Sequence, residues 1–333
     1  MDKINYHQQL KELSNKTFLI TGSAGFIGFS LAKELLTAGC EIVGIDNFND
    51  YYEVSLKEER NRILEKYPNY KVYRGDISDC DFIKDVLNKH AFDKVINLAA
   101  QAGVRPSLIN PYPYFQSNVL GFLNLINESK NRGIKDFIYA SSSSVYGNQT
   151  KLPFSDFSNS FQPDSFYGVT KLIDESIANY YHKIYGLSCT GLRFFTVYGP
   201  YGRPDMAYYL FTSNLFKNEK FKVFGNGLMK RDFTYIDDII AGIVSAIYYS
   251  YPFEVFNLGN DNPVEIKTLI DVLEKETGHK AKPIFLPVQS GDMLITHANI
   301  ESAKVKLGYK PIVKIEEGLK NFIDWYKKYN KVN

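Results

Sequence analysis

Apolar residues in the first two hundred positions of this chain fall into short strand-like runs separated by amphipathic segments of helix length. The runs are TFLIT from residue 17, EIVGID from 41, KVYRGD from 71, KVINLAA from 94, DFIYASS from 136 and SCTGLRFF from 188. Strands that alternate with helices form βαβ units, and these build a parallel sheet with helices on both faces. We therefore expect an α/β fold with a doubly wound parallel sheet.

The spacing of the runs loosens after about residue 200, where KVFG from 222, RDFTYIDD from 231 and VFNLG from 255 precede a C-terminal helical run through Trp325. We expect a main domain over 17–200 and a smaller C-terminal α/β substrate lobe over 201–333. A strand followed by a long buried helix is predicted from residue 231, so about 231–260 should return to the main domain. Residues 1–16 are expected to form an arm containing a short amphipathic helix.

Composition narrows the function classes. The chain has 333 residues, 44% hydrophobic and 23% charged, with 39 basic and 37 acidic side chains and no long basic block, so neither nucleic acid nor an anionic membrane is an expected partner. No apolar run is long enough for a membrane span, and the first residues lack the apolar core of a signal peptide. Cys40, Cys80 and Cys189 are widely spaced and odd in number, which predicts no disulfide framework, no metal site and a cytoplasmic location.

Three glycines, Gly22, Gly25 and Gly28, follow the first strand and open a helix in FLITGSAGFIGFSLAKELLTAG. Glycine allows a tight turn and close backbone approach to a pyrophosphate, which the helix N-terminus attracts. Asp46 ends the second strand, where a ribose-binding carboxylate belongs. The pattern predicts a Rossmann-type dinucleotide site, and the carboxylate favours NAD over NADP because it would repel a 2′-phosphate. A merely structural glycine turn is the alternative.

Two further strand ends extend this prediction. Asp76, in RGDI, is placed to meet the adenine edge, although capping the next helix is an alternative role. Ala99 and Ala100, in NLAAQAG, are small enough to let the cofactor pass close to the backbone.

Candidate acid–base chemistry lies downstream. Tyr167 and Lys171 are four residues apart in SFYGVTKLIDESIANYY and therefore share a helix face. An ammonium group near a phenol favours the phenolate and lowers the pKa of the tyrosine, so this pair can remove and return a hydroxyl proton. Four serines, Ser141 to Ser144, end the strand in DFIYASSSSVYG and aim hydroxyl groups at the same sheet edge. A surface helix pair and a loop of self-bonded serines are the alternatives.

Together, the TGxxGFIG-type turn, the serine-rich strand end and YxxxK resemble the extended short-chain dehydrogenase/reductase family over nearly the whole chain. In that family, the residue three positions before the valine of VYG helps to bind the reacting sugar oxygen, which implies a catalytic Ser142 beside Tyr167 and Lys171. This chain has YGVTK where the family usually has YAATK, and the acid–base pair is retained. The implied cofactor-binding residues are Gly22, Gly25, Phe26, Ile27, Gly28, Asp46, Asn47, Asp76, Ile77, Leu98, Ala99, Ala100, Asn118, Tyr167 and Lys171.

Ser143 and Ser144 bear on the reaction. Related sugar-nucleotide dehydratases have Asp and Glu in these two positions, because they must eliminate water, and this chain lacks both carboxylates. What remains suits reversible oxidation at C4, in which Tyr167 takes the hydroxyl proton, the 4-keto sugar rotates, and hydride returns to its other face. Tightly bound NAD would be regenerated in every turnover.

Several longer segments look like UDP-glucuronate 4-epimerases of bacterial surface-polysaccharide pathways: DNFNDYYEVSLKEERNRIL, AAQAGVRPSLINPYPYFQSN, ASSSSVYG, GLRFFTVYGPYGRPDMA and KRDFTYIDD. The resemblance implies that Arg203 binds the C6 carboxylate with Ser143, Ser144 and Thr196, and that Arg231 holds the diphosphate. Asp292 and Arg105 are further implied substrate ligands. Bracing a loop (Arg203), pairing with Asp232 or Asp237 (Arg231) and a solvated turn (Asp292) are the alternatives.

Other functions stay open at this point: a 4-epimerase of neutral UDP-hexoses or UDP-N-acetylhexosamines, a UDP-glucuronate decarboxylase, or an NAD-binding regulator without activity. The resemblance also implies a homodimer built from two helices of each subunit. The helices around 113–131 and 165–185 are the candidates for a four-helix bundle.

Overall fold

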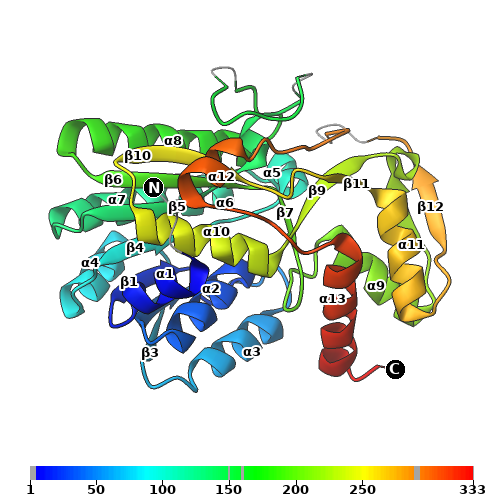
Figure 1. Cartoon of the computed structure of the whole chain (residues 1–333), viewed down its shortest axis with the longest axis horizontal. Coiled ribbons are helices and arrows are strands. Elements are labelled where there is room, and N and C mark those ends of the chain that lie inside the picture. The colour runs from blue at the N-terminus through cyan, green and yellow to red at the C-terminus, as the bar shows by residue number, and fades with distance from the viewer. Residues whose placement is uncertain (1–4, 149–150, 159–160, 289–292, 333) are drawn as a thin grey trace.

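The computed structural model describes residues 5–148, 151–158, 161–288 and 293–332 (Figure 1). Through the sixth strand, its elements are α1 (Tyr6–Leu13), β1 (Thr17–Thr21), α2 (Phe26–Thr37), β2 (Glu41–Asp46), α3 (Val54–Leu64), β3 (Tyr70–Arg74), α4 (Cys80–Lys89), β4 (Lys94–Asn97), α5 (Val104–Ile109), α6 (Tyr112–Tyr114), the π-helical segment η1 (Phe115–Leu120), α7 (Gly121–Asn131), β5 (Asp136–Ser142), the 3-10 turn η2 (Ser143–Val145), α8 (Phe166–Tyr185) and β6 (Ser188–Phe194).

The later elements are β7 (Thr196–Tyr198), α9 (Ala207–Lys217), β8 (Phe221–Phe224), the 3-10 turn η3 (Gly225–Gly227), β9 (Lys230–Tyr235), α10 (Ile236–Tyr249), β10 (Phe253–Leu258), β11 (Pro263–Glu265), α11 (Ile266–Thr277), β12 (Pro283–Leu286), α12 (Glu301–Leu307) and α13 (Ile315–Asn330).

Seven parallel strands form the main sheet in the order β10-β6-β5-β4-β1-β2-β3. The chain builds outward from β1 to β3 and then restarts on the other side of β1 with β4. The carboxyl ends of β1 and β4 therefore flank the switch point at which ligands bind in open parallel sheets. The predicted Rossmann-type doubly wound sheet is confirmed.

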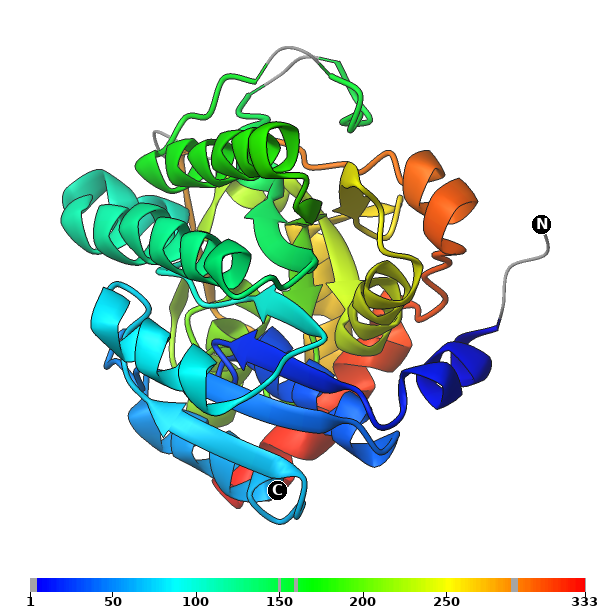
Figure 2. The ribbon, with the colours of Figure 1, turned by 90° about the vertical axis from the view of Figure 1, so that its left-hand side faces the viewer.

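Helices cover both faces of this sheet (Figure 2). Each strand sends alternate side chains to the two faces. In β1, Leu19 joins the core under α4, α7 and α8, whereas Phe18 and Ile20 join the core under α2 and α10. All three are fully buried, and burying such a side chain stabilises the fold by about 1.5 to 3 kcal/mol. The sheet is thus held from both sides, which fixes the strand ends in space.

Helix α8 carries the predicted acid–base pair and has well-defined ends. The hydroxyl of Ser165 caps its start by accepting a hydrogen bond from the backbone N–H of Gly168 at 3.1 Å. Gly186 ends the helix in the left-handed conformation at φ +67°, where glycine has no steric penalty. The start of the helix lies beside the carboxyl end of the sheet, because α8 packs against β5 and the turn η2 that follows it.

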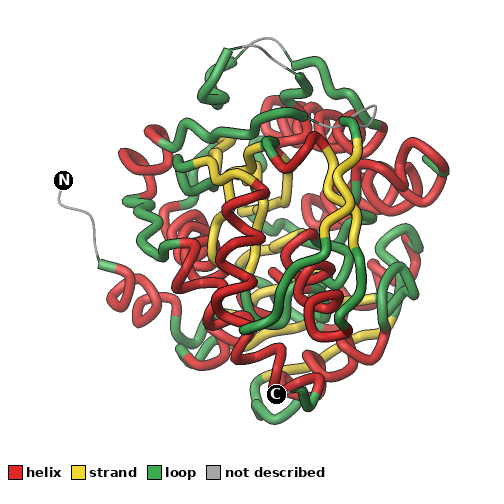
Figure 3. Tube along the Cα trace, turned by 90° about the vertical axis from the view of Figure 1, so that its right-hand side faces the viewer, coloured by secondary structure: helices red, strands yellow, loops and turns green. Residues whose placement is uncertain are grey.

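The C-terminal lobe lies beyond that edge and contains two small sheets and the helices α9, α11 and α13 (Figure 3). One sheet has the order β11-β9-β7 and the other pairs β12 with β8. Of the segment predicted to return to the main domain, β10 joins the seven-stranded sheet and α10 packs against α2. Strand β9 instead pairs with β7 and β11 in the lobe.

The N-terminal helix α1 lies within the arm predicted over residues 1–16 and packs on its own chain. Ser245 of α10 donates a hydrogen bond to the side-chain oxygen of Gln9 at 2.9 Å, and the hydroxyl of Tyr6 donates to Glu34 of α2 at 3.0 Å. These contacts fix the arm to the sheet face that α2 and α10 cover.

None of the described helices combines the length and apolar character needed to cross a bilayer. The three cysteines are free thiols, and burial raises the pKa of Cys40 and Cys189 to about 12. Among the described residues, no group of three or more His, Cys, Asp and Glu side chains could hold a metal ion.

Candidate active site

A cavity of about 250 Å³ opens at the carboxyl ends of the central strands. It lies at the switch point between β1 and β4, where the strand order of the sheet reverses. Fourteen of the fifteen predicted cofactor-binding residues line it, all except Asn118, together with Ser142 and Arg203 of the predicted substrate residues. Gly22 and Arg203 are 181 positions apart in the sequence, and the fold brings them to the same cavity.

The glycine turn between β1 and α2 leaves no room for side chains. A Cβ on Gly22 would lie 2.8 Å from the backbone nitrogen of Ala99, and one on Gly28 would lie 2.1 Å from the carbonyl oxygen of Gly22. Gly22 also has a φ of +70°. Helix α2 begins at Phe26, and no side chain caps it. Phe26, Ile27 and Gly28 line the cavity, so the backbone N–H groups of the first turn are available to a ligand there. This cradle fits the diphosphate of a dinucleotide.

Asp46 ends β2 and is buried at the cavity wall. One carboxylate oxygen accepts the backbone N–H of Ala24 at 3.0 Å and the other accepts that of Phe48 at 2.8 Å. Each oxygen retains acceptor capacity, because an ionised carboxylate has about four lone-pair sites. The geometry suits a carboxylate that accepts further hydrogen bonds from ribose hydroxyls.

Asp76 lies on the same wall but does not cap the next helix. That cap is Asp79, whose side chain accepts the N–H groups of Asp81 and Phe82. Asp76 instead accepts hydrogen bonds from the side chain of Asn47 at 2.7 Å and from the backbone of Ser78 at 2.9 Å. Burial works to raise the pKa of Asp76, but these hydrogen bonds outweigh it and the pKa is lowered.

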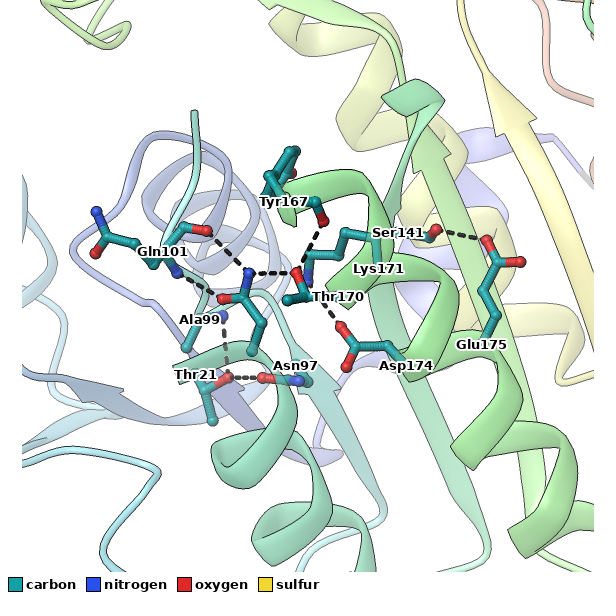
Figure 4. A network of polar contacts seen from close by, with 11 residues as sticks. Thr21, Asn97, Ala99, Gln101, Ser141, Tyr167, Thr170, Lys171, Asp174 and Glu175 are labelled. Atoms are coloured by element: carbon teal, nitrogen blue, oxygen red, sulfur yellow. Dashed lines mark hydrogen bonds and ion pairs between the residues drawn. The ribbon is translucent and has the colours of Figure 1, made fainter. Parts of the chain in front are cut away.

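The opposite wall follows β4. The hydroxyl of Thr21 accepts the backbone N–H of Ala99 at 3.2 Å and donates to Asn97 at 2.6 Å (Figure 4). Asn118, behind this wall, bonds both backbone groups of Gln101 and donates to the hydroxyl of Thr170 at 2.9 Å. Asn118 therefore links the loop after β4 to α8 rather than facing the cavity.

Tyr167 and Lys171 of α8 both line the cavity. The Lys171 ammonium is buried and donates to Asp174, one turn further along the helix, at 3.0 Å (Figure 4). Burial raises the pKa of the Asp174 carboxyl to about 7, against the lowering effect of Lys171. The backbone N–H of Tyr167 donates to the hydroxyl of Ser107 at 3.1 Å, which ties the start of α8 to α5.

The serine run divides into two parts. Ser141 and Ser142 line the cavity, whereas Ser143 and Ser144 continue into the turn η2 and are not among its lining residues. Ser141 donates to Glu175 at 2.5 Å, and Glu175 forms a buried two-point ion pair with Arg193. Ser142 caps the turn by accepting the N–H of Ser144 at 3.1 Å, and its own hydroxyl donates to the hydroxyl of Ser144 at 3.1 Å.

Arg203 lines the cavity from the lobe side and forms a two-point ion pair with Asp205. Its Nε lies 3.0 Å from one carboxylate oxygen and its Nη2 lies 2.6 Å from the other. The hydroxyl of Tyr51 donates to the same carboxylate at 3.4 Å. Arg203, the predicted carboxylate-binding arginine, thus already forms an ion pair with a carboxylate of its own chain at the cavity.

Three further predicted substrate residues, Arg105, Thr196 and Arg231, are not among the residues that line this cavity. Arg231 donates to the carbonyl oxygens of Lys230 and Leu294, and the guanidinium of Arg105 lies 4.5 Å from the ring centre of Phe224 on β8. Thr196 is in β7, next to the lining residues Phe195 and Val197. Asp292 lies outside the described residues.

Sequence reasoning missed several lining residues from the loop after β2 and from α3, among them Tyr51, Tyr52 and Lys57. Lys57 is buried, which lowers its pKa, and it donates to the backbone and side chain of Asn49 at 2.6 and 2.7 Å. A signal was present, because Leu56 and Leu64 mark a buried face on which positions 57 and 60 also lie.

Comparisons with known proteins agree with this site. Residues 18–259 match the NAD dependent epimerase/dehydratase family. The chain is 48% identical to an uncharacterized protein of Methanocaldococcus jannaschii over 93% of this chain and 96% of that protein. It is 44% identical to UDP-glucuronate 4-epimerase 4 of Arabidopsis thaliana over 94% of this chain and 76% of that protein.

A solved structure gives the same picture. UDP-glucuronic acid 4-epimerase from Bacillus cereus, in complex with UDP-glucuronic acid and NAD, has a TM-score of 0.88 and 36% identity, covering 94% of this chain and 99% of that chain. The chain therefore belongs to the NAD dependent epimerase/dehydratase family, as a sugar-nucleotide epimerase with NAD as its cofactor.

Proposed function

We propose that this protein is a 4-epimerase that interconverts UDP-glucuronate and UDP-galacturonate, as a step in supplying precursors for surface polysaccharide. The observation that carries the proposal is the cavity itself, which places a dinucleotide cradle, the Tyr167–Lys171 pair, Ser142 and Arg203 around one space. The similarity to UDP-glucuronate 4-epimerases supports the choice of substrate.

NAD, when bound, accepts a hydride from C4 of the sugar and returns it. The glycine turn and the start of α2 would hold its diphosphate, and Asp46 would accept hydrogen bonds from its adenosine ribose. Ala99 and Ala100 line the cavity, and their small side chains would let the cofactor pass close to the backbone.

Proton transfer falls to Tyr167. Its phenol oxygen takes the proton of the sugar 4-hydroxyl while C4 is oxidised, holds it, and returns it when C4 is reduced. The ammonium of Lys171, on the same helix face, stabilises the phenolate form, and Ser142 donates a hydrogen bond to the reacting oxygen. With serines at 143 and 144, no acid–base pair is available at those positions to eliminate water.

Arg203 is suited to the C6 carboxylate of an acidic sugar. Asp205 engages its Nε–H and one N–H of Nη2, and a guanidinium has five N–H donors, so three remain for a substrate carboxylate. The sugar carboxylate can therefore bind without breaking the internal pair. Holding that carboxylate in place also opposes its loss as carbon dioxide from a 4-keto acid.

The same ion pair favours one alternative. Asp205 neutralises the charge of Arg203 at the cavity, which reduces the advantage of an acidic sugar over a neutral one. A 4-epimerase of neutral UDP-hexoses or UDP-N-acetylhexosamines is therefore the second candidate. Arg231, Arg105 and Asp292 remain predicted ligands of the UDP half, and Ser143, Ser144 and Thr196 remain predicted ligands of the sugar.

We further propose that two copies assemble through α7 and α8. Large apolar side chains are exposed along these helices and the preceding η1: Phe115 (52%), Leu123 (40%), Tyr180 (51%), Ile184 (61%) and Tyr185 (48%). An apolar surface of this kind on two adjacent helices suits a second copy of itself, which gives a four-helix bundle.

Proton NMR of the purified protein with UDP-glucuronate and no added NAD tests the function directly. Appearance of UDP-galacturonate, lost in Tyr167→Phe, is the expected result. Release of carbon dioxide with a pentose nucleotide would identify a decarboxylase, and conversion of UDP-glucose or UDP-N-acetylglucosamine instead would identify the neutral-sugar epimerase. Binding of NAD with no conversion of any of these sugars would indicate a regulator.

A further inference from the structure

Arg60 of α3 is a fully buried cation that the proposed chemistry does not use. Its side chain is 0% exposed, and within the described residues no carboxylate lies within ion-pair distance of its guanidinium. All of its hydrogen bonds go to neutral oxygens: the carbonyls of Ala24, Tyr201 and Gly202 and the hydroxyl of Tyr52. A buried charge without a counter-charge is costly, so its presence calls for a reason.

One reason lies at the glycine turn. Nη1 of Arg60 donates to the carbonyl oxygen of Ala24 at 3.0 Å, while the backbone N–H of the same residue donates to Asp46 at 3.0 Å. Ala24 is therefore held from both sides, between the turn that fits the diphosphate and the carboxylate that fits the ribose. The unneutralised guanidinium also gives this turn a positive field, which an anionic diphosphate would complete.

The other end of Arg60 holds the loop that leads to Arg203. Nε and Nη2 donate to the carbonyl oxygen of Tyr201 at 3.2 and 2.5 Å, and Nη2 also donates to that of Gly202 at 3.3 Å. Tyr201 has a φ of +60°, a left-handed conformation that a tyrosine adopts only when its surroundings enforce it. Arg60 supplies part of that enforcement, immediately before Arg203.

We propose that Arg60 is a positioning residue that couples the dinucleotide turn to the loop of Arg203. Filling of the turn then fixes the Tyr201–Gly202 backbone, and a disturbance of that backbone weakens the dinucleotide site. The inference rests on the proposed function only for the role of Arg203 in binding a sugar carboxylate; the coupling itself involves NAD alone.

The protein contains its own reporter for this coupling. Trp325 is the only tryptophan of the chain, and its ring lies 5.0 Å, centre to centre, from the ring of Tyr201. Tryptophan emission therefore reports on the loop, at a residue that does not line the cavity. In the whole protein stripped of NAD, adding oxidised NAD should change the emission of Trp325.

The test compares Arg60→Gln, Arg60→Lys and the control Arg62→Gln. Arg62 is two residues away on the same helix, exposed and paired with Glu59. Arg60→Gln should bind NAD at least about tenfold more weakly by calorimetry and lose the Trp325 response. Arg60→Lys, which keeps the charge but not the planar fork, should retain more of the NAD affinity and still lose the response. Arg62→Gln should match the parent protein.

Three results would overturn the proposal: no Trp325 response in the parent protein, an Arg60→Gln variant within about twofold of Arg62→Gln in both readouts, or a normal response in a folded Arg60→Lys. Circular dichroism establishes whether each variant is folded. If Arg60→Gln does not fold, the Trp325 responses of Arg60→Lys and of the parent protein decide whether the coupling exists. No sugar nucleotide enters these measurements. An absence of UDP-glucuronate epimerisation would therefore count against the proposed function and leave the coupling to be judged separately.

Discussion

Lys171 donates its buried hydrogen bond to Asp174 at 3.0 Å, so the ammonium of the predicted Tyr167–Lys171 pair shares its charge with a carboxylate one turn away. The neighbouring carboxylate Glu175 is already paired with Arg193 of β6, and the buried phenol of Tyr139 on β5 has no hydrogen-bond partner among the described residues. Asp174 therefore balances Lys171 before any ligand arrives.

This pair predicts a pH-dependent stability. Burial raises the pKa of Asp174 to about 7, whereas an aspartate in an unfolded chain titrates near 4. The folded protein keeps this proton where the unfolded chain has lost it, so the contribution of Asp174 to the free energy of unfolding falls as the pH rises from about 4 to about 7.

Asp174→Asn removes this titration. Relative to that of the parent protein, the free energy of unfolding of the variant should rise between about pH 4 and about pH 7, by roughly 1 to 4 kcal/mol at the upper end. Thermal unfolding across that range measures the effect. The exposed Asp85→Asn, on α4, should show no such trend, and a pH-independent difference for Asp174→Asn would contradict the raised pKa.

Arg203 and Asp205 should act on substrate choice in opposite directions. Arg203→Gln removes a charge-assisted contact worth about 1.5 to 3 kcal/mol, so the KM for UDP-glucuronate should rise about tenfold to a hundredfold relative to that for a neutral UDP-sugar. Asp205→Asn leaves the guanidinium unneutralised and should increase the preference for the acidic sugar. Steady-state kinetics with both sugars measures the two ratios, and equal effects on both sugars would favour a loop-bracing role for Arg203.

Gly28→Ala should remove NAD binding. The added Cβ would lie 2.1 Å from the carbonyl oxygen of Gly22, and neither backbone segment can retreat without opening the turn. Overpacking of this kind costs about 1 to 3 kcal/mol of stability. Calorimetric titration with NAD and thermal unfolding check both effects. Gly186→Ala is the control, because it introduces strain at φ +67° with no atom within 4 Å and should leave NAD affinity unchanged.

Ile184→Glu should separate the proposed dimer. Residue 184 is 61% exposed on α8, and a carboxylate there would be buried without a partner between two copies. Light scattering after size-exclusion chromatography should give a dimer for the parent protein and a monomer for the variant. Val305→Glu, at a 63% exposed apolar position on α12, should stay dimeric. A monomeric parent protein would exclude the assembly.

Local patterning was sufficient for most of the sheet. The six runs in the first two hundred positions became β1 to β6, because most of these strands are buried apolar segments between turns, whereas β3 at the sheet edge is only partly buried. The lobe was harder, since β7 and β11 have only three residues each and owe their existence to pairing with β9. Strands this short carry no periodic signal, and their partners are distant in the chain.

For the site, residues recognised by fixed spacing, such as the glycine turn and Tyr167 with Lys171, could be placed in the cavity from the sequence. Partners could not. The contact of Arg60 with Tyr201 joins side chain and backbone across 141 positions of the sequence. The ion pair between Arg203 and Asp205 depends on the shape of the turn between them, which the sequence does not determine. A charged residue on a buried helix face is visible in a sequence, but its contacts are decided by the tertiary fold.

The lobe has no single connection to the sheet. The chain enters it after β6, comes back with α10 and β10, enters again with β11, and returns for α12 before ending in α13. Cutting one linker would not release an independent unit. The lobe and the sheet are therefore not two separately folded bodies joined by one hinge. It is better regarded as a set of long insertions at strand ends. Enzymes built in this way can acquire a new substrate by remodelling one insertion while the cofactor half stays intact.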